Sequence, residues 1–182
     1  QRVSVFTIPM MIGNMAAGTV AIKTGFKGVN FCPVSACSSG AHSVGEAFRA
    51  IKYGNADVML AGGSEACRVG FAFAGFNNMH AITKSTDVNR ASIPFDKERS
   101  GFVLGDGAGV LVIEEYEHAK ARGARIYAEI AGYGATCDAF HETSPDPSGA
   151  GGAKAMELAV KEAGVPFEQI NYINAHGTST NL

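Results

Sequence analysis

Short, nearly continuous apolar runs alternate with longer helical patterns along this chain, and this alternation constrains its fold most strongly. Residues 29–34 and 57–61 are apolar runs of strand length, bounded by glycine and other small residues. Helical patterns occupy residues 9–24 and 41–53, and residues 71–82 are expected to be helical or irregular. Because an uninterrupted apolar run is typical of a strand buried on both faces, we expect the 57–61 strand to be parallel to its neighbours. The order of elements predicts an α/β layered fold.

A second cycle of strand and helix follows a short charged helix at residues 117–122, which Gly123 ends. This cycle comprises a strand at 126–134, a polar loop at 141–152, a helix at 153–164 and a strand at 170–174. Between the two cycles, the proline-broken residues 83–99 predict a surface loop, and residues 101–115 predict two short strands around a glycine-rich bend. The similarity of the two cycles indicates a duplicated fold.

Composition and charge narrow the class of protein. The chain has 182 residues, of which 46% are hydrophobic and 18% charged, as in folded globular proteins. A net charge of -2 provides no basic field for nucleic acid or an anionic membrane, although a local basic patch could still receive an acidic carrier protein. The apolar stretches are far shorter than the roughly 20 residues of a membrane span. We therefore expect a soluble protein of the cytoplasm, or of a plastid or mitochondrion, without nucleic-acid or membrane partners.

Cys37 is the candidate nucleophile, because it lies between small residues in the run S-A-C-S-S-G, where a predicted strand meets a predicted helix. Small neighbours leave room for a substrate, and a helix N-terminus favours a thiolate and a developing oxyanion. A cysteine in such a position is also often a small core residue, so this alternative stays open. The other cysteines lack this context, form no zinc pattern and are expected to be structural free thiols: Cys32, Cys67 and Cys137.

His176 forms a second candidate feature, in the run N-A-H-G-T-S-T directly after a predicted strand. The carboxyl ends of strands are where α/β proteins collect functional groups. His42 and His118 fall within predicted helices and are interpreted as structural or solvated. The glycines at 62–63 and 105–107 fit no phosphate-binding pattern, so we interpret both as sites of tight backbone packing.

Several longer motifs resemble one known family. They are V-S-A-C-S-S-G-A-H at 34–42, A-D-V-M-L-A-G-G-S-E at 56–65, P-F-D-K-E-R-S-G-F-V-L-G-D-G-A-G at 94–109, the charged run at 114–130 and N-A-H-G-T-S-T. Their order and spacing are similar to those of the β-ketoacyl-acyl-carrier-protein synthases, and within them of the synthase II type of fatty-acid elongation. The resemblance extends over essentially the whole chain.

The resemblance implies a thiolase-like fold of two related α/β halves packed as layers of helices and sheets. This chain would hold the latter part of the first half, residues 1–123, and the start of the second half, residues 124–182. It also implies a homodimer in which the strand at 29–34 pairs across a two-fold axis. The implied partner is an acyl carrier protein whose phosphopantetheine arm carries the substrates, with neither a metal nor a redox cofactor.

The same resemblance implies a mechanism and a set of site residues. Cys37 would accept an acyl group as a thioester, malonyl-carrier would lose carbon dioxide, and the carbanion would attack the acyl-enzyme. His176 would stabilise the enolate, and Thr178 and Thr180 would contact the phosphopantetheine arm. The resemblance implies further contacts in three places. These are Thr143 and His141 in the tunnel that holds the phosphopantetheine arm, Phe76 in the acyl pocket, and Met11 and Ile12 against the dimer partner's pocket.

The chain also departs from the family pattern. The family's second catalytic histidine, its lysine and its glycine-rich gating segment would lie beyond residue 182, so we expect this chain alone to be inactive in condensation. Ile93 stands where the family usually has arginine before P-F-D, which affects the ion pairs expected in that loop. Residues 77–79 replace smaller residues and leave the preferred acyl length open.

Four alternatives remain at this point. A polyketide ketosynthase would share Cys37 and His176, whereas a noncatalytic chain-length partner would keep the fold but lack the nucleophile, and the presence of Cys37 speaks against it. A thiolase acting on coenzyme A esters would need another cysteine and is disfavoured by H-G-T-S-T. A Cys-His hydrolase would need an activated water that no residue here supplies.

Overall fold

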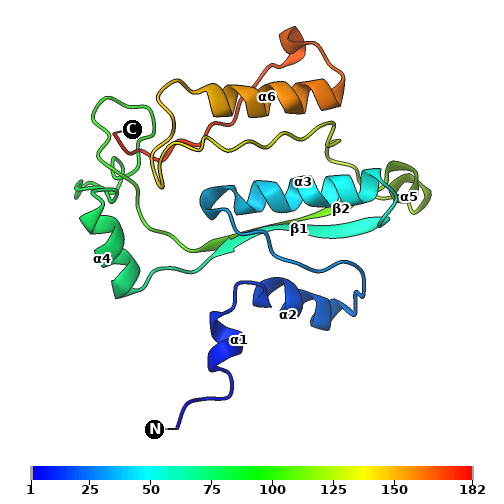
Figure 1. Cartoon of the computed structure of the whole chain (residues 1–182), viewed down its shortest axis with the longest axis horizontal. Coiled ribbons are helices and arrows are strands. Elements are labelled where there is room, and N and C mark those ends of the chain that lie inside the picture. Colours follow the sequence, from blue (N-terminus) through cyan, green and yellow to red (C-terminus); the bar gives the residue numbers. More distant parts are fainter. Residues whose placement is uncertain (1, 182) are drawn as a thin grey trace. The chain divides into compact units, whose positions relative to one another are not determined.

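The computed structural model describes residues 2–181. Its helices and strands are α1 (Thr7–Met11), α2 (Met15–Thr24), η1 (Ala36–Ser38), α3 (Ser39–Lys52), β1 (Val58–Glu65), α4 (Gly70–Asn78), β2 (Gly107–Glu114), α5 (Tyr116–Ala121), α6 (Ala150–Ala163) and η2 (Phe167–Gln169) (Figure 1). The contacts divide the chain into two compact units. Unit 1 comprises the described residues up to Gly63 together with Gly109–Ile130, and unit 2 comprises Ser64–Ala108 and the described residues from Ala131 onward.

Strands β1 and β2 pair with each other and are antiparallel. The N–H of Glu115 donates to the carbonyl of Asp57 at 2.9 Å, whereas Gly62, further along β1, lies against Gly109 and Val110. The partner's residue number falls as β1 advances, so the prediction of a parallel strand is wrong. A continuous apolar run indicates burial on both faces, but it carries no information on the direction of the neighbouring strand.

Helix α3 covers the β1–β2 pair and forms the core of unit 1 (Figure 1). The buried side chains are Ala47 of α3, Ala61 of β1 and Ile113 of β2, with partly buried apolar residues around them. A Cβ atom at Gly63 would lie only 3.2 Å from the Cα of Gly40, so the glycine lets the first turn of α3 approach the strand backbone. Tight backbone packing at residues 62–63 is thereby confirmed.

The same interpretation is wrong for the glycines at 105–107. Apart from the glycine and its two chain neighbours, no atom of the described residues lies within 4 Å of a Cβ placed at Gly105 or Gly107. The residue between them, Asp106, is instead held by Arg68, whose Nε donates to Asp106 Oδ2 at 2.6 Å. This ion pair draws the turn of 105–107 to the segment after β1. The pKa of Asp106 is lowered, first by the hydrogen bond from Arg68.

Three predicted strands form no strand pairing among the described residues: 29–34, 126–134 and 170–174. A strand exists only where a second backbone supplies the ladder of hydrogen bonds, and no described segment does so here. Apolar side chains of the first segment consequently face solvent, and Val34 is 83% exposed. Residues 101–115 form one strand, β2, instead of two, while Phe102 makes an isolated bridge with Ile82.

The predicted helices are present, with shifted ends. The helix expected at 9–24 is divided into α1 and α2 because Ile12 is extended, with φ -77° and ψ 133°, and so interrupts the helical hydrogen bonds. Gly25 ends α2 with a φ of +74°, and Gly123 follows α5 with a φ of +70°, as predicted. The loop at 83–99 contains no helix or strand, which also agrees with the prediction.

In unit 2, helix α6 packs on the chain segment at 131–134 (Figure 1). Cβ atoms at Gly132 and Gly134 would overlap the carbonyl oxygens of Ala159 and Ala155. The two glycines alternate along the segment and therefore lie on one face of it, against the helix. The N–H of the residue between them, Tyr133, donates to the carboxylate of Glu162 at 3.0 Å.

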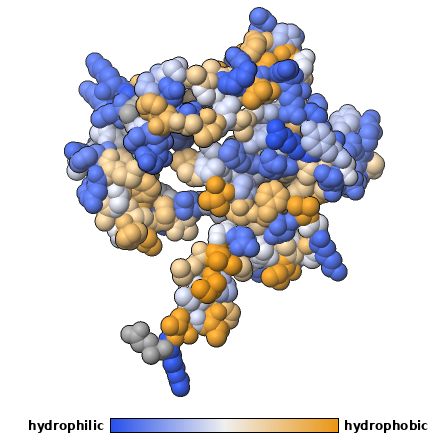
Figure 2. All heavy atoms as spheres, viewed as in Figure 1, coloured by the Kyte–Doolittle hydropathy of each residue, from blue (hydrophilic) through white to orange (hydrophobic). Residues whose placement is uncertain are grey.

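Much apolar surface is left uncovered by the described residues. Along α1 and α2, Met10 and Ile22 are each 80% exposed, and hydrophobic side chains gather over these helices in Figure 2. Among residues 2–181, no helix has the length and apolar character needed to span a bilayer.

Glu114, at the end of β2, forms a half-exposed ion cluster with α5 and the residue after it. Its carboxylate is 7% exposed and accepts from Nε and Nη2 of Arg122, both at 2.6 Å, and it lies 2.6 Å from Nδ1 of His118. His118 is therefore structural, as interpreted from the sequence. The hydrogen bonds from Arg122, followed by that from His118, lower the pKa of Glu114 to about 2.

This cluster predicts an acid-dependent loss of stability. Since the pKa of Glu114 is lowered from 4.5 to about 2 on folding, its ionised form stabilises the folded protein above pH 4.5. The contribution decreases as the pH falls from 4.5 toward 2. In the full-length protein, Glu114→Gln is expected to lower the thermal unfolding midpoint at pH 6, and the difference from wild type should shrink at pH 3.

The matched control is Glu117→Gln, since Glu117 is 71% exposed and only faces Lys120 at 3.7 Å. This variant should melt like wild type at both pH values. A deficit in Glu114→Gln that is equally large at pH 6 and pH 3 would show that the ion cluster does not titrate as described.

Candidate active site

Cys37 lies on a tight turn that runs into helix α3. The 3-10 helix Ala36–Ser38 is followed without a break by α3, so Cys37 stands at the first turn of a longer helical segment. Ala36, directly before it, has a φ of +50°, in the left-handed region that alanine rarely adopts. Such backbone strain costs about 1–3 kcal/mol and clusters at functional sites. Cys37 itself is exposed among the described residues, which leaves its thiol accessible as a nucleophile requires.

Hydrogen bonds from neighbouring side chains hold this turn. The N–H of Ser35 donates to Oγ of Ser39 at 2.9 Å, and that hydroxyl donates to the carbonyl of Ala36 at 2.8 Å. A further hydrogen bond joins Oγ of Ser35 to Nδ1 of His42 at 2.6 Å. His42 is thus structural, as interpreted from the sequence. Ser35 and Ser39 were given no role from the sequence, although their four-residue spacing across a predicted helix start could have indicated one.

The other three cysteines occupy different settings. Cys32 is exposed in the segment that was predicted to be a strand, and Cys137 is exposed as well. Cys67 is half-buried, and its pKa is raised, first by desolvation and then by the carboxylates of Glu65 and Asp106. A raised pKa keeps the thiol protonated, and the thiolate is the reactive form. The turn geometry therefore distinguishes Cys37 from the other three.

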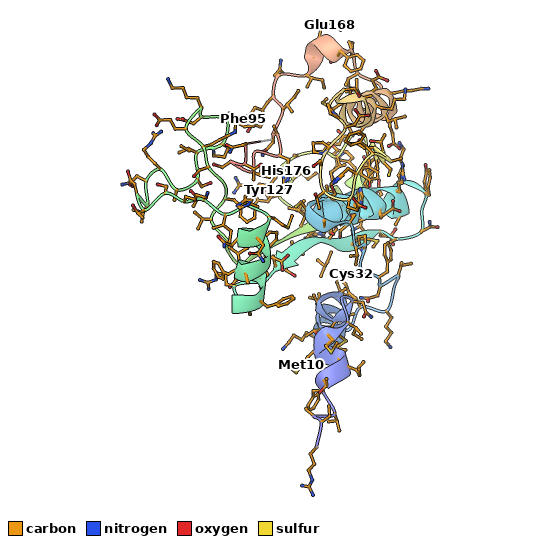
Figure 3. All side chains as sticks on the ribbon, turned by 60° about the vertical axis from the view of Figure 1, so that its left-hand side comes forward. Met10, Cys32, Phe95, Tyr127, Glu168 and His176 are labelled. Carbon is orange, nitrogen blue, oxygen red and sulfur yellow. The ribbon has the colours of Figure 1, made fainter. Side chains whose placement is uncertain are left out.

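His176 lies at a pocket within unit 2. The pocket has a volume of about 200 Å³ and is lined by Phe95, Arg99 and residues 176–180. Figure 3 labels His176 and Phe95, which approach this pocket from two separate segments of the chain. The hydroxyls of Thr178 and Thr180 are hydrogen-bonded to each other at 2.6 Å. The structure thus brings three of the predicted site residues together in one loop.

Ser179 connects that loop to another segment of the chain through hydrogen bonds. It is only 2% exposed and has a φ of +65°, while its neighbours on both sides face the pocket. Its Oγ accepts from the N–H of Ile93 at 3.1 Å, and its carbonyl accepts from the N–H of Gly101 at 2.7 Å. Ile93, the departure from the family pattern, therefore contributes through its backbone. Sequence reasoning missed Ser179 because its partners are more than 70 residues away along the chain.

The remaining predicted contact residues fall into three separate places. In unit 2, Nδ1 of His141 accepts from the N–H groups of Thr143 and Ser144, both at 3.1 Å, so the neutral ring carries its proton on Nε2. Phe76 of α4 packs edge-on against Phe102, with ring centroids 5.2 Å apart. Two exposed residues at the end of α1, in unit 1, complete the predicted set: Met11 and Ile12.

Comparison with known families gives the site its context. The family description "Beta-ketoacyl synthase, N-terminal domain" matches residues 1–119, and "Beta-ketoacyl synthase, C-terminal domain" matches residues 127–182. The chain belongs to the β-ketoacyl synthase family. The predicted resemblance is thereby confirmed, and both Cys37 and His176 fall within matched regions.

Curated relatives of this chain include two bacterial proteins with the same name. The chain is 53% identical over 181 residues to 3-oxoacyl-[acyl-carrier-protein] synthase 2 of Vibrio cholerae, covering 99% of the chain and 44% of the relative. It is 51% identical over 180 residues to the protein of the same name from Staphylococcus aureus, covering 99% of the chain and 45% of the relative. The chain therefore spans less than half the length of the curated relatives it matches.

Solved β-ketoacyl synthase structures share its fold. A type II PKS ketosynthase, solved with its acyl-carrier protein and a hexaketide, matches with a TM-score of 0.94 at 37% identity, over 98% of the chain and 44% of that structure. A β-ketoacyl synthase from Burkholderia phymatum matches with a TM-score of 0.89 at 42% identity, over 98% of the chain and 43% of that structure. The prediction of a partial thiolase-like α/β fold is confirmed.

Proposed function

We propose that the full-length protein is a β-ketoacyl-acyl-carrier-protein synthase of the type II, fatty-acid-elongating class. The exposed thiol of Cys37, on a strained turn at the start of α3, is the observation that carries this proposal. It occurs in a chain that is 53% identical to a 3-oxoacyl-[acyl-carrier-protein] synthase 2. A soft, accessible nucleophile at a helix start is suited to thioester exchange.

The reaction begins with acyl transfer to Cys37. The thiolate attacks the acyl thioester on the carrier, a sulfur–carbonyl bond forms, and the carrier's phosphopantetheine thiol leaves with a proton from the solvent. Malonyl-carrier then loses carbon dioxide, and the electron pair of the broken carbon–carbon bond forms an enolate. This carbanion attacks the acyl-Cys37 carbonyl, which forms the new carbon–carbon bond and releases the thiolate of Cys37.

His176 is the proposed donor to the enolate oxygen. A neutral imidazole N–H that is already in place before decarboxylation stabilises the charge as it develops. The hydroxyls of Thr178 and Thr180 line the same pocket and are proposed to contact the phosphopantetheine arm. Their mutual hydrogen bond at 2.6 Å fixes both oxygens without a substrate present.

Further substrate contacts are proposed for the outlying residues. His141 and Thr143 share one turn and would line the path of the phosphopantetheine arm. Phe76, held edge-on by Phe102, would border the acyl chain. Exposed apolar side chains at the end of α1, Met11 and Ile12, would contact the pocket of a second copy in a homodimer.

We also propose how the full-length protein assembles and how its two halves divide. The uncovered segment at 29–34 would pair with its equivalent in the second copy, which would satisfy its backbone hydrogen bonds. We propose that residues 1–123 and 124–182 belong to the first and second halves of the synthase fold. An acyl carrier protein is the proposed partner, and the cytoplasm the proposed location.

A polyketide ketosynthase is the second candidate function. The observation in its favour is the TM-score of 0.94 to the ketosynthase of a type II PKS. The two functions use the same bond-forming step and differ in the acyl chains accepted. A synthase of fatty-acid elongation extends chains whose β-carbon has been reduced, whereas a polyketide ketosynthase extends β-keto chains.

The test is condensation by the full-length protein with purified acyl carrier proteins. Given a saturated acyl-carrier and malonyl-carrier, it should form a β-ketoacyl-carrier two carbons longer and release one carbon dioxide per product. Preferential extension of β-keto substrates would favour the polyketide function. Release of free fatty acid without a new carbon–carbon bond would contradict both and favour a hydrolase.

A further inference from the structure

The segment at 93–101 holds the loop at 176–180 by its backbone. Gly101 and Ile93 donate to Ser179 from opposite ends of this segment, at 2.7 Å and 3.1 Å. Between them, the ring of Phe95 and the side chain of Pro94 lie 2.9 Å from where a Cβ at Gly177 would stand. The loop that carries His176 is thus fixed from a part of the chain about 80 residues away.

Arg99 makes the most specific of these contacts. Its Nε donates to the carbonyl of Thr180 at 2.6 Å, across a separation of 81 residues. Its Nη1 donates to the carbonyl of Asp96 at 3.1 Å, and its Nη2 reaches the carbonyl of Asn181 at 3.5 Å. The planar guanidinium therefore connects the two segments through three backbone carbonyls. A lysine ammonium is a compact charge and lacks the fork needed to hold this geometry.

The backbone is strained both in the loop at 176–180 and in the segment at 93–101 that holds it. Ser179 has a φ of +65° and Phe95 a φ of +68°, both in the left-handed region that non-glycine residues rarely adopt. Strained residues persist only where the surrounding contacts over-determine them. The hydrogen bonds of Arg99 and Ser179 supply those contacts, and the strained loop carries His176 and both threonine hydroxyls into the pocket.

We propose that Arg99 is a positioning residue for the malonyl step of condensation. By holding the carbonyl of Thr180, it sets the place of His176 and of the hydroxyls of Thr178 and Thr180 relative to the bound malonyl thioester. This inference rests on the proposed function. Because misplacing a catalytic group by about 1 Å can cost about 100-fold in rate, loss of the clamp should slow decarboxylation strongly. The turn that carries Cys37 makes none of these hydrogen bonds, and His176 has no proposed part in acylation. Acyl transfer to Cys37 should therefore lose much less than condensation, although displaced hydroxyls of Thr178 and Thr180 would also weaken contact with the arm of the acyl-carrier.

The experiment compares Arg99→Gln and Arg99→Lys with wild type in the full-length protein. Two steps are measured separately: acylation of Cys37 by acyl-carrier, followed by intact mass, and condensation with malonyl-carrier, followed by product formation. Arg99→Gln should lose about 100-fold in condensation kcat and at least tenfold less than that, about 10-fold at most, in the rate of Cys37 acylation. Arg99→Lys should recover little, because it keeps the charge but not the fork.

The matched control is Arg90→Gln, which removes the same charge from the same loop. Arg90 forms ion pairs with two solvent-exposed carboxylates, those of Asp96 at 3.4 Å and Glu98 at 2.7 Å. It should condense like wild type. Ser179→Ala provides a second variant that keeps Arg99 but removes the acceptor for the N–H of Ile93, and it should show the same selective loss of condensation.

Each outcome decides the role of Arg99. An equal loss of acylation and condensation in both Arg99→Gln and Ser179→Ala would overturn it, because that pattern reports general damage to the fold. A condensation kcat within threefold of wild type in Arg99→Gln would overturn it as well, as would full rescue by Arg99→Lys. Failure of the proposed function is recognised separately, since wild type itself would then form no condensation product.

Discussion

Replacing Cys37 by alanine in the full-length protein is expected to reduce condensation by a factor on the order of 10⁶, the size of effect seen when a covalent nucleophile is removed. No other described cysteine combines exposure with a strained helix-start turn. Without the thiol, the acyl group has no acceptor, so the first chemical step fails. Malonyl decarboxylation should persist, because the proposed enolate donor His176 is left intact.

Two matched variants test this specificity for Cys37. Cys32 and Cys137 are also exposed thiols, and Cys32→Ala and Cys137→Ala should each retain condensation within about twofold of wild type. The rates are measured by product formation from acyl- and malonyl-carrier proteins. If Cys37→Ala kept more than about one hundredth of the wild-type rate, acyl transfer would have to proceed without this thiol, which contradicts the mechanism.

The second large effect is expected for His176→Ala. Removing one preorganised donor to a developing oxyanion typically costs about 10²–10³ in kcat, so both decarboxylation and condensation should fall by about this factor. Acylation of Cys37 should continue, since His176 has no proposed part in that step. The acyl-enzyme should therefore accumulate, and intact mass can detect it.

A histidine outside the pocket provides the control for His176. His80 is exposed, lies in unit 2 and has a φ of +55°, a conformation that asparagine tolerates well. His80→Asn should condense like wild type. Equal loss of Cys37 acylation and condensation in His176→Ala would argue against an enolate role, because it would place His176 in the thiol chemistry instead.

Local features were predictable from the sequence, and features that depend on distant partners were not. The turn around Cys37 is made by residues 35–42, and the small residues of S-A-C-S-S-G indicated it directly. The ends of α2 and α5 followed from Gly25 and Gly123 for the same reason. By contrast, the antiparallel pairing of β1 depends on β2, which lies about 50 residues further along the chain. The residues at 57–61 do not indicate in which direction that partner strand runs.

The pocket residues also separate into those with a local sequence pattern and those that depend on distant partners. H-G-T-S-T indicated His176, Thr178 and Thr180, because hydroxyls beside a histidine are a local pattern. No local pattern singled out Arg99 or Ser179, although both lie within the motifs that resemble the family. Arginine and serine are usually solvated, and only the fold reveals that these two hold the loop through backbone contacts.

Strands without partners mark another limit of sequence reasoning. Residues 29–34 have the composition of a buried strand, yet no described segment pairs with them and Val34 faces solvent. The apolar composition of a segment indicates that it is buried in the folded protein. Whether it forms a strand depends on a second segment that pairs with its backbone. We propose that the remainder of the synthase and a second copy supply that burial, so the isolated 182-residue chain is expected to be inactive in condensation.

The most direct test of the central claim is intact-mass and peptide-mapping analysis of the full-length protein after exposure to a medium-chain acyl-carrier thioester. The account predicts one added acyl group, located on the peptide that contains Cys37 and lost in Cys37→Ala. A folded protein whose Cys37 remains unmodified, or one acylated at another residue, would contradict the assignment of Cys37 as the nucleophile and would favour a noncatalytic partner subunit.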